Sequence, residues 1–268
     1  MGEYFDLGGK TALIVGGTSG IGLAVARRFT AAGCRTTVAG RSAKPGCDTG
    51  SLEFHACDLT VDASVASLFA NVVERCGPLD ILVINAGIAP EDSGPLGSMT
   101  PDEFDRAMAT NTRGAWLCLN EAPEAMAAGG SIILTGSAAA DLVFPGYANY
   151  GASKSALMIM ARHAAAQLGE HGIRVNCISP GTVLTPMQPG DDPEAQICRV
   201  QTCLGRAGTT DEVVGAYHFL AADDSRYVTA TELVVDGGWV GGVTLQSAEA
   251  MLNGLGGNSI EGEGRGRH

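Results

Sequence analysis

The first apolar run of the chain and the residues behind it read Thr11-Ala12-Leu13-Ile14-Val15-Gly16-Gly17-Thr18-Ser19-Gly20-Ile21-Gly22. Residues 11–15 predict a buried strand, and the amphipathic pattern from about Ile21 to Ala32 predicts a helix. Glycine is needed between them, where the backbone turns tightly and where the helix packs close to the strand. This stretch therefore predicts a strand, a tight turn and a helix, which is the opening unit of an α/β fold.

The same alternation of short apolar runs and helical patterns continues along the chain. We expect further strands at Thr36 to Ala39, Leu52 to Ala56, Ile81 to Ile84, Ser131 to Leu134, Arg174 to Ile178 and Glu232 to Val235. We expect further helices at Val61 to Arg75, Pro101 to Leu119, Tyr150 to Leu168 and Asp211 to Leu220. Continuous apolar runs are typical of parallel strands that helices cover on both faces. The sequence thus predicts a single-domain, doubly wound (Rossmann) parallel sheet with helices on both faces.

No internal repeat and no linker divides the chain. Its 268 residues suit one large α/β domain, which we place at residues 1–253. The glycine-rich, polar stretch 254–268 is expected to form a flexible tail. Pro123 is expected to end or kink the helix that follows Asn111. The segment from Thr185 to Leu204 is rich in Pro, Gly and Asp, and we expect a mobile loop there.

The composition excludes several classes of protein. Hydrophobic residues make up 45% and charged residues 17%, which allows a large core, and the net charge of −12 disfavours nucleic acid and anionic membranes as partners. The eight cysteines include no C-x-x-C pair and have no histidine cluster beside them, so we expect no metal site. No signal peptide is recognised, and no apolar stretch reaches the roughly 20 residues that cross a bilayer, so we expect a cytoplasmic protein.

The glycine-rich turn is the first candidate for a ligand site. A helix that begins directly after such a turn offers free backbone amides and the positive end of its dipole to phosphate groups. Glycine-rich turns between a strand and a helix also occur as plain turns, so the pattern alone is weak. With a predicted strand before it and a predicted helix behind it, we favour the binding of a dinucleotide.

Residues 39–42 bear on which dinucleotide is bound. A site for the ribose 2′-hydroxyl usually presents Asp or Glu at the end of the second strand, but this chain has Ala-Gly-Arg-Ser. Arg41 can pair with a 2′-phosphate, and no carboxylate is present to repel that group. We therefore expect NADP(H) to be preferred, with NAD(H) possible. The alternative for Arg41 is an ordinary solvated cation.

A tyrosine, a lysine and a serine form the candidate catalytic group. Tyr150 and Lys154 stand four residues apart at the start of a predicted helix, which places them on one face. A tyrosine hydroxyl with a pKa near 10 is a poor base at pH 7, so we expect the Lys154 ammonium and a cationic nicotinamide to lower that pKa. Ser137 follows a predicted strand and should face the same crevice as the glycine turn, where its hydroxyl can hold a substrate oxygen. The alternatives are an exposed Tyr/Lys pair and a serine that only ends a strand.

In these residues the chain resembles the short-chain dehydrogenase/reductase family, from about Gly8 to Gly238. The matching positions, in order, are Gly16, Gly20 and Gly22; Asp58; Asn85-Ala86-Gly87; Asn111; Ser137; Tyr150 with Lys154; Pro180-Gly181 with Thr185; and Asp236-Gly237-Gly238. Three departures stand beside them, because Val15 replaces a usual Thr, Ile84 replaces the first Asn of Asn-Asn-Ala-Gly, and Ala230 replaces a Gly. They put in doubt only local hydrogen bonds and the seating of the cofactor.

The resemblance implies a role for each matching residue. Tyr150 would be the general acid in reduction and the base in oxidation, Lys154 would hold the nicotinamide ribose, Ser137 would orient the substrate carbonyl, and Asn111 would anchor a proton-relay water. Asp58 would meet the adenine edge, Asn85 the adenosine ribose region and Thr185 the carboxamide. The cofactor-binding residues implied are Gly16, Thr18, Ser19, Gly20, Ile21, Gly22, Arg41, Asp58, Leu59, Asn85, Ala86, Gly87, Tyr150, Lys154, Pro180, Gly181, Val183 and Thr185.

The function that we predict is hydride transfer between NADP(H) and a carbonyl or secondary alcohol of a small organic substrate. An NAD-dependent dehydrogenase of the same family and a nucleotide sensor without turnover are the alternatives, and an enoyl reductase fits the three catalytic residues less well. Leu142, Val143, Phe144, Leu184 and Met187 are candidate apolar walls of the substrate pocket. The resemblance also implies a homotetramer, with subunit contacts from the helices that contain Trp116 and Tyr150.

Overall fold

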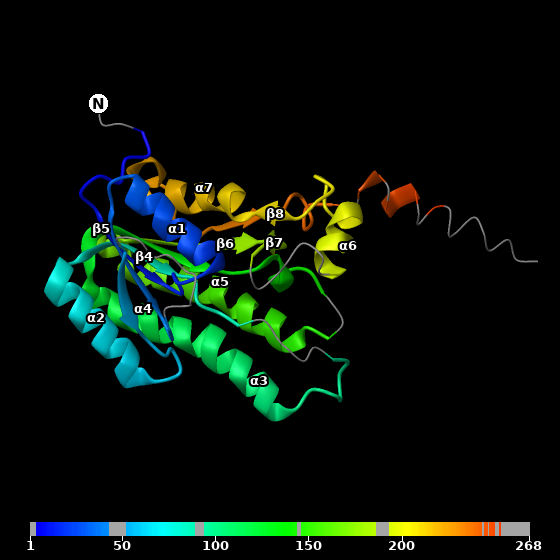
Figure 1. The fold of residues 1–268 in the computed structure, drawn as a ribbon, viewed down its shortest axis with the longest axis horizontal. Coiled ribbons are helices and arrows are strands. Elements are labelled where there is room, and N and C mark those ends of the chain that lie inside the picture. The colour runs from blue at the N-terminus through cyan, green and yellow to red at the C-terminus, as the bar shows by residue number, and fades with distance from the viewer. Residues whose placement is uncertain are drawn as a thin grey trace, which may run out of the picture.

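The computed structural model of the chain describes residues 4–42, 52–88, 94–143, 146–185, 193–242, 244–245, 247–249 and 252. A seven-stranded sheet runs through the molecule (Figure 1). Its strands, in spatial order, are β3 (Glu53–Ala56), β2 (Arg35–Gly40), β1 (Thr11–Val15), β4 (Leu79–Ile84), β5 (Met126–Thr135), β6 (Arg174–Pro180) and β9 (Glu232–Val235). Every neighbouring pair is parallel, which confirms the predicted doubly wound sheet.

Helices cover both faces of this sheet (Figure 1). On one face α1 (Gly20–Ala31) packs against α7 (Thr210–Ala221), over a core that includes Phe29 and Tyr217. On the other face lie α2 (Asp62–Cys76), α4 (Gly114–Ala125) and α5 (Ala148–Leu168). Because alternate residues of a strand point to opposite faces, Leu134 of β5 faces α5 whereas Thr135 faces α7.

The remaining elements are short. They are the helices α3 (Pro101–Ala107) and α6 (Pro193–Gln201), the π-helix η1 (Met108–Arg113), the 3-10 helices η2 (Ala138–Ala140), η3 (Gly169–His171) and η4 (Asp223–Ser225), and the paired strands β7 (Val183–Leu184) and β8 (Gly208–Thr209). The start of α3 is fixed by a capping box between Thr100 and Glu103. Within the described part of the chain, no helix has the length and hydropathy that a membrane span requires.

Two predictions about loops and breaks need correction. The predicted helix Pro101 to Leu119 is interrupted by η1. The predicted end of the helix near Pro123 is confirmed, because α4 ends at Ala125. The segment from Thr185 to Leu204 is not a loop throughout, because residues 193–201 form α6. Thr182 Oγ1 donates a 2.9 Å hydrogen bond to Glu194 and docks this helix. Residues 186–192 and the predicted tail 254–268 lie outside the described residues.

The sheet order places the candidate site at the carboxyl ends of the central strands. The chain leaves β1 toward β2 and β3 and then returns to place β4 on the other side of β1. Connections on the two sides of such a switch point diverge and leave a crevice beyond the strand ends. Gly16 follows β1, Asn85 follows β4 and Ser137 follows β5, so the sequence-predicted residues border this crevice.

Candidate active site

The glycine loop after β1 is shaped by close backbone approaches. Gly16 has a φ of +83°, and a Cβ there would lie 2.5 Å from the backbone of Ala86. A Cβ on Gly22 would lie 2.6 Å from the side-chain nitrogen of Asn85. Gly20 has a φ of +53°, a conformation that L side chains rarely adopt. Glycine at these positions therefore brings the loop against the exit of β4.

The start of α1 fits a dinucleotide phosphate. Ser19 is the N-cap residue, but its side chain makes no capping hydrogen bond, and no acidic residue lies in the first turn. The first amides of a helix have no partner within the helix, so those of α1 are directed at the crevice with no carboxylate beside them. Thr18 is buried and packs against Gly40 at the end of β2. An uncapped, glycine-lined helix start is the donor set that a pyrophosphate requires.

Asn85 holds this loop from the neighbouring strand. Its side-chain Nδ2 donates to the carbonyl oxygen of Gly16 at 3.1 Å, and its backbone amide donates to Val15 at 2.9 Å. Its Oδ1 accepts a 3.1 Å hydrogen bond from the Thr135 hydroxyl. The amide group is thus used within the protein, and its contact with a ribose stays a prediction.

Lys154 is a buried cation at the centre of the site, with 4% of its surface exposed. Its Nζ donates a 2.9 Å hydrogen bond to the carbonyl oxygen of Thr135 and lies 5.8 Å from the centre of the Tyr150 ring. A Cβ on Gly87 would lie 3.2 Å from this nitrogen. Burial lowers the Lys154 pKa to about 8. No ion pair with a carboxylate is found for Lys154 among the described residues.

Tyr150 and Ser137 lie within hydrogen-bonding reach, as the sequence predicts. Ser137 begins η2, where its Oγ accepts a 3.1 Å hydrogen bond from the amide of Ala139. Burial raises the Tyr150 pKa above its ordinary value, the hydrogen bond with Ser137 acts to lower it, and the charge of Glu194 raises it further. In the protein alone, desolvation of the phenol outweighs the favourable contacts. The lowering of this pKa by Lys154 together with a cationic nicotinamide stays a prediction.

Asn111 joins the exit of β4 to the catalytic helix. It lies in η1 and is fully buried. Its Oδ1 accepts from the amide of Ile88 at 2.8 Å, and its Nδ2 donates to Ile88 O and to Ser153 Oγ. The Ser153 hydroxyl in turn donates to the carbonyl oxygen of Tyr150 at 2.7 Å. Asn111 thus lies next to Lys154 and Tyr150, and its relay water stays a prediction.

The structure also brings the remaining cofactor candidates to the crevice. Asp58 accepts hydrogen bonds from the amide and hydroxyl of Thr60, which lower its pKa together with the charge of exposed Arg41. Leu59 is buried beside them. On the other side of the crevice, Thr185 lies 3.5 Å from the position of a Cβ on Gly20. The loop that leads there is held by the Gly181 amide, which donates to Val235, and passes through buried Val183 after Pro180.

Three functional positions were missed by the sequence analysis. Thr135 accepts from Lys154 and donates to Asn85, Ser153 links Asn111 to Tyr150, and Glu194 of α6 acts on Tyr150. Thr135 directly follows the predicted strand Ser131 to Leu134, and Ser153 stands between Tyr150 and Lys154, so these two positions carried a sequence signal. The other missed contacts depend on how separate helices pack. Cys198 of α6 is fully buried with a raised pKa, which disfavours the reactive thiolate form.

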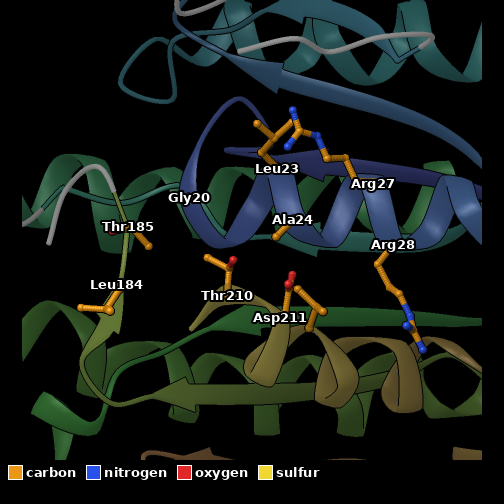
Figure 2. Close-up of a pocket in the computed structure, with 10 residues that line it drawn as sticks. Gly20, Leu23, Ala24, Arg27, Arg28, Leu184, Thr185, Thr210 and Asp211 are labelled. Carbon is orange, nitrogen blue, oxygen red and sulfur yellow. The ribbon is translucent and has the colours of Figure 1, made fainter. Parts of the chain in front are cut away.

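Two hollows adjoin the crevice. The larger, of about 670 Å³, opens between α1 and α7 and has Gly20, Thr185 and Asp211 on its rim (Figure 2). The smaller, of about 320 Å³, lies between the start of α3 and the start of α5 and is lined by apolar residues that include Leu96, Met99 and Phe104. The crevice is therefore open on its α1 side and has an apolar recess next to the helix of Tyr150.

Comparison with known proteins agrees with this geometry. Residues 15–240 match a family profile described as Enoyl-(Acyl carrier protein) reductase. Momilactone A synthase of Oryza sativa subsp. japonica is 39% identical over 247 residues, which cover 86% of this chain and 89% of that protein. The (+)-borneol dehydrogenase 2 of Salvia officinalis is 33% identical over 86% of this chain and 89% of its own length.

A solved structure agrees as well. The blue fluorescent protein from a metagenomic library, in complex with NADPH, superimposes with a TM-score of 0.80 at 35% identity, covering 87% of this chain and 99% of that chain. The family profile spans most of the sequence, and the relatives align over nearly their full lengths. The chain is therefore an NAD(P)-dependent oxidoreductase that belongs to the short-chain dehydrogenase/reductase family.

Proposed function

We propose that this enzyme interconverts a secondary alcohol and a ketone with NADP(H), using Ser137, Tyr150 and Lys154. The observation that carries the proposal is the convergence of these three side chains at the glycine-lined crevice. Ser137 hydrogen-bonds the Tyr150 phenol, and the buried Lys154 ammonium lies 5.8 Å from the centre of the same ring. A hydroxyl donor, a proton donor and a desolvated cation together suit the reduction of a carbonyl.

Each residue has a chemical role in this proposal. In reduction the Tyr150 hydroxyl gives its proton to the substrate oxygen, while the Ser137 hydroxyl holds that oxygen in place. Lys154 stabilises the phenolate that remains, and in oxidation Tyr150 takes the proton back. The bound nicotinamide donates or accepts the hydride. The raised Tyr150 pKa keeps the phenol protonated and ready to donate before the substrate arrives.

The preference for NADP(H) is supported at the end of β2. Arg41 is exposed there, and residues 39–42 contain no carboxylate. A guanidinium in this place pairs well with a 2′-phosphate. The solved relative described above carries NADPH. NAD(H) is the alternative cofactor. A direct comparison of the activity with the two nucleotides decides between them.

The proposed substrate has an apolar carbon skeleton. The recess of about 320 Å³ beside α5 is lined largely by apolar side chains, among them Leu96, which is more than nine-tenths exposed. Val143, a predicted wall of the pocket, is exposed to the same degree. Exposed apolar side chains around a recess are typical of a binding surface. One relative is a borneol dehydrogenase. Leu142 and Leu184 remain candidate walls, whereas Phe144 and Met187 lie outside the described residues.

The proposed assembly is a homotetramer in the cytoplasm. Trp116 of α4 and Ile159 of α5 are each half exposed, and large apolar side chains on these two helices suit a subunit contact. The described cysteines are all free thiols, which suits a reducing compartment. Size-exclusion chromatography with light scattering tests the assembly.

The test of the function combines a substrate screen with one variant. Secondary alcohols and ketones of monocyclic and bicyclic hydrocarbons are offered with NADPH, NADP, NADH and NAD, and turnover is followed by absorbance of the reduced nicotinamide. Tyr150→Phe should lower kcat by about 1,000-fold while nucleotide affinity stays within a factor of about 3, because the variant loses only the transferred proton. Tyr227→Phe, which changes a fully exposed tyrosine, is the matched control.

Three outcomes would contradict the proposal. Full activity of Tyr150→Phe would remove Tyr150 from the chemistry. Turnover of an enoyl thioester with no turnover of any ketone or alcohol would move the enzyme to another reaction class. Nucleotide binding without turnover of any offered substrate would favour the nucleotide sensor.

A further inference from the structure

A buried tyrosine on α7 lies behind the active site and takes no part in the proposed chemistry. Tyr217 is fully buried in the core between α7 and the sheet. Its hydroxyl lies 2.8 Å from Thr135 Oγ1. Thr135 ends β5, the strand that leads to Ser137. A phenol buried at this depth needs a hydrogen-bond partner, and it has found one at the edge of the catalytic crevice.

The direction of the hydrogen bonds in this group is fixed by the donors available. Asn85 Nδ2 donates to Gly16 O, so Asn85 presents its oxygen to Thr135. The single proton of the Thr135 hydroxyl is used in that bond, and Thr135 must accept from Tyr217. The reversed amide would set its oxygen against the Gly16 carbonyl oxygen, which excludes it. A directed chain therefore runs from Tyr217 through Thr135 and Asn85 to Gly16.

Thr135 connects this chain to the catalytic lysine. Its side chain faces α7, whereas its carbonyl oxygen accepts the 2.9 Å hydrogen bond from Lys154 Nζ. One residue thus anchors both the glycine loop and the buried ammonium. Movement of Thr135 would displace Lys154 and release Asn85 at the same time.

We propose that Tyr217 is a positioning residue for the nucleotide site, holding the glycine loop and Lys154 in place through Thr135 and Asn85. This inference rests on the nucleotide binding in the proposed function and adds a residue on the far side of the sheet. These hydrogen bonds hold the carboxyl ends of the central strands, where the buried residues Val15 and Ile84 carry no hydrogen-bonding side chain of their own. Burial raises the Tyr217 pKa, so its hydroxyl stays a donor over the working pH range.

The test is Tyr217→Phe, which removes one oxygen and keeps the ring. The dissociation constants of NADPH and NADH, measured by fluorescence titration without substrate, should rise by about tenfold, the effect of one lost buried hydrogen bond together with a displaced loop. Amide hydrogen exchange of residues 16–22 should become faster in the protein without nucleotide. The KM for the nucleotide should rise more than kcat falls.

Ser131→Ala is the matched control. The Ser131 hydroxyl is also buried and also ties β5 to α7, through a 2.7 Å hydrogen bond to Leu220 O, but it lies four residues before Thr135, in the middle of β5 and away from the crevice. We expect a similar fall in Tm for the two variants and unchanged nucleotide affinity for Ser131→Ala. Thr135→Ser, which keeps the hydroxyl, should bind nucleotide as the wild type does. Tyr217→Phe should add nothing to Thr135→Val, because that variant already lacks the chain.

Wild-type affinity and exchange in Tyr217→Phe would overturn the inference, and so would an equal loss of affinity in Ser131→Ala. These readouts need no substrate, so they are separate from the Tyr150→Phe test. The positioning role of Tyr217 does not depend on finding an alcohol that the enzyme oxidises. Absence of any nucleotide binding by the wild type would overturn both proposals.

Discussion

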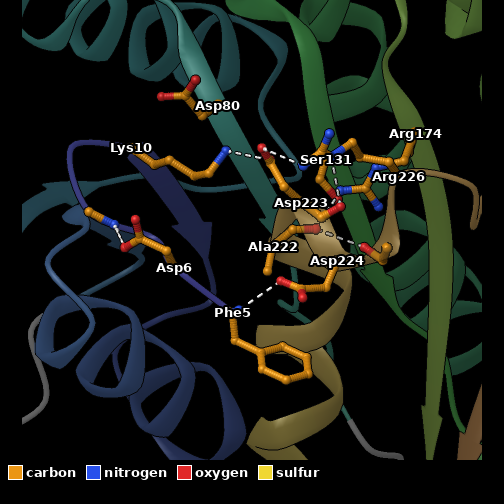
Figure 3. A network of polar contacts seen from close by, with 12 residues as sticks. Phe5, Asp6, Lys10, Asp80, Ser131, Arg174, Ala222, Asp223, Asp224 and Arg226 are labelled. Atoms are coloured by element: carbon orange, nitrogen blue, oxygen red, sulfur yellow. Dashed lines mark hydrogen bonds and ion pairs between the residues drawn. The ribbon is translucent and has the colours of Figure 1, made fainter. Parts of the chain in front are cut away.

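A buried cation lies at each end of the parallel sheet, and the polar groups around the two cations differ. At the carboxyl ends of the strands, Lys154 is buried, and among the described residues its one hydrogen-bond acceptor is the carbonyl oxygen of Thr135. At the amino ends, Arg174 is also buried, but it donates to Ala222 O and is stabilised by the charge of Asp223 (Figure 3). Lys10 donates to the same Asp223 at 2.9 Å. Asp223 compensates the buried Arg174 only in part, because desolvation still lowers the Arg174 pKa and its Nη1 has no hydrogen-bond partner among the described residues. The carboxyl ends instead keep a buried cation, Lys154, for chemistry.

This difference separates what stabilises the fold from what makes it an enzyme. Burial of an ammonium without a carboxylate partner destabilises the folded state. Lys154 nevertheless stays buried because the surrounding backbone holds its ammonium in place. The same desolvation strengthens the field that a developing phenolate experiences. Stability is therefore expected to rise, and activity to fall, when the charge of Lys154 is removed. At the amino ends, removal of the Asp223 charge is expected to lower stability and to leave activity unchanged.

Lys154→Met is the variant with the largest expected effect. Turnover should fall by at least about 1,000-fold, because the proton donor loses the cation that stabilises its phenolate. A pKa lowered from 10.5 to about 8 corresponds to a cost on the order of 3 kcal/mol for the buried cation at neutral pH. The variant should therefore unfold at a higher urea concentration than the wild type at pH 7.

The stability difference between the wild type and Lys154→Met should change with pH in a defined direction. The folded-state pKa is the lower one, so between pH 8 and 10.5 the unfolded state binds more protons than the folded state. The wild type gains stability relative to Lys154→Met as the pH rises through this window. Urea unfolding of both proteins at pH 7, 8, 9 and 10 measures the difference. At the upper end of this range the difference also contains a contribution from Cys177, because its charge and that of Lys154 shift each other's pKa. A variant less stable than the wild type at pH 7 would contradict the comparison.

Arg41→Ala sharpens the comparison at the end of β2. The kcat/KM for NADPH should fall by about 10- to 100-fold, the value of a charge-assisted hydrogen bond, while that for NADH should change by less than about twofold. Arg35→Ala, at the amino end of the same strand, is the matched control and should leave both values unchanged. Equal losses of kcat/KM for NADPH and NADH would show that Arg41 is an ordinary surface cation and does not pair with the 2′-phosphate.

Much of the fold was predictable because its determinants are local. The first strand has the predicted bounds 11–15, since a continuous apolar run followed by glycine leaves few other conformations. Gly16, Gly20 and Gly22 have backbone conformations or close approaches that other residues cannot share. Tyr150 and Lys154 could be paired from helical spacing, and Ser137 from its place after a strand.

The rest could not be predicted because it depends on contacts distant in sequence. Tyr217 and Thr135 meet across 82 positions, and no pattern in either segment indicates the other. Glu194 reaches the site only because α6 docks on Thr182, in a segment whose composition suggested a loop. The direction of the Tyr150 pKa shift depends on how far the phenol is desolvated, which is a property of the packed structure.

Asp223→Asn tests the amino ends of the strands and should have the smallest effect. The Asp223 side chain is more than half exposed. Loss of its charge should therefore lower the free energy of unfolding by about 1 kcal/mol and leave kcat/KM unchanged. The Asp223 pKa is lowered by the hydrogen bond from Lys10, so its stabilisation is present above the ordinary pKa and is lost as the pH falls through the folded-state value. The variant and the wild type should therefore converge in stability once the pH lies below the lowered pKa of Asp223. Asp62→Asn, which breaks an exposed pair with Arg113, should cost less, because no buried guanidinium depends on that carboxylate. A loss of activity in Asp223→Asn would show that the two ends of the sheet are coupled.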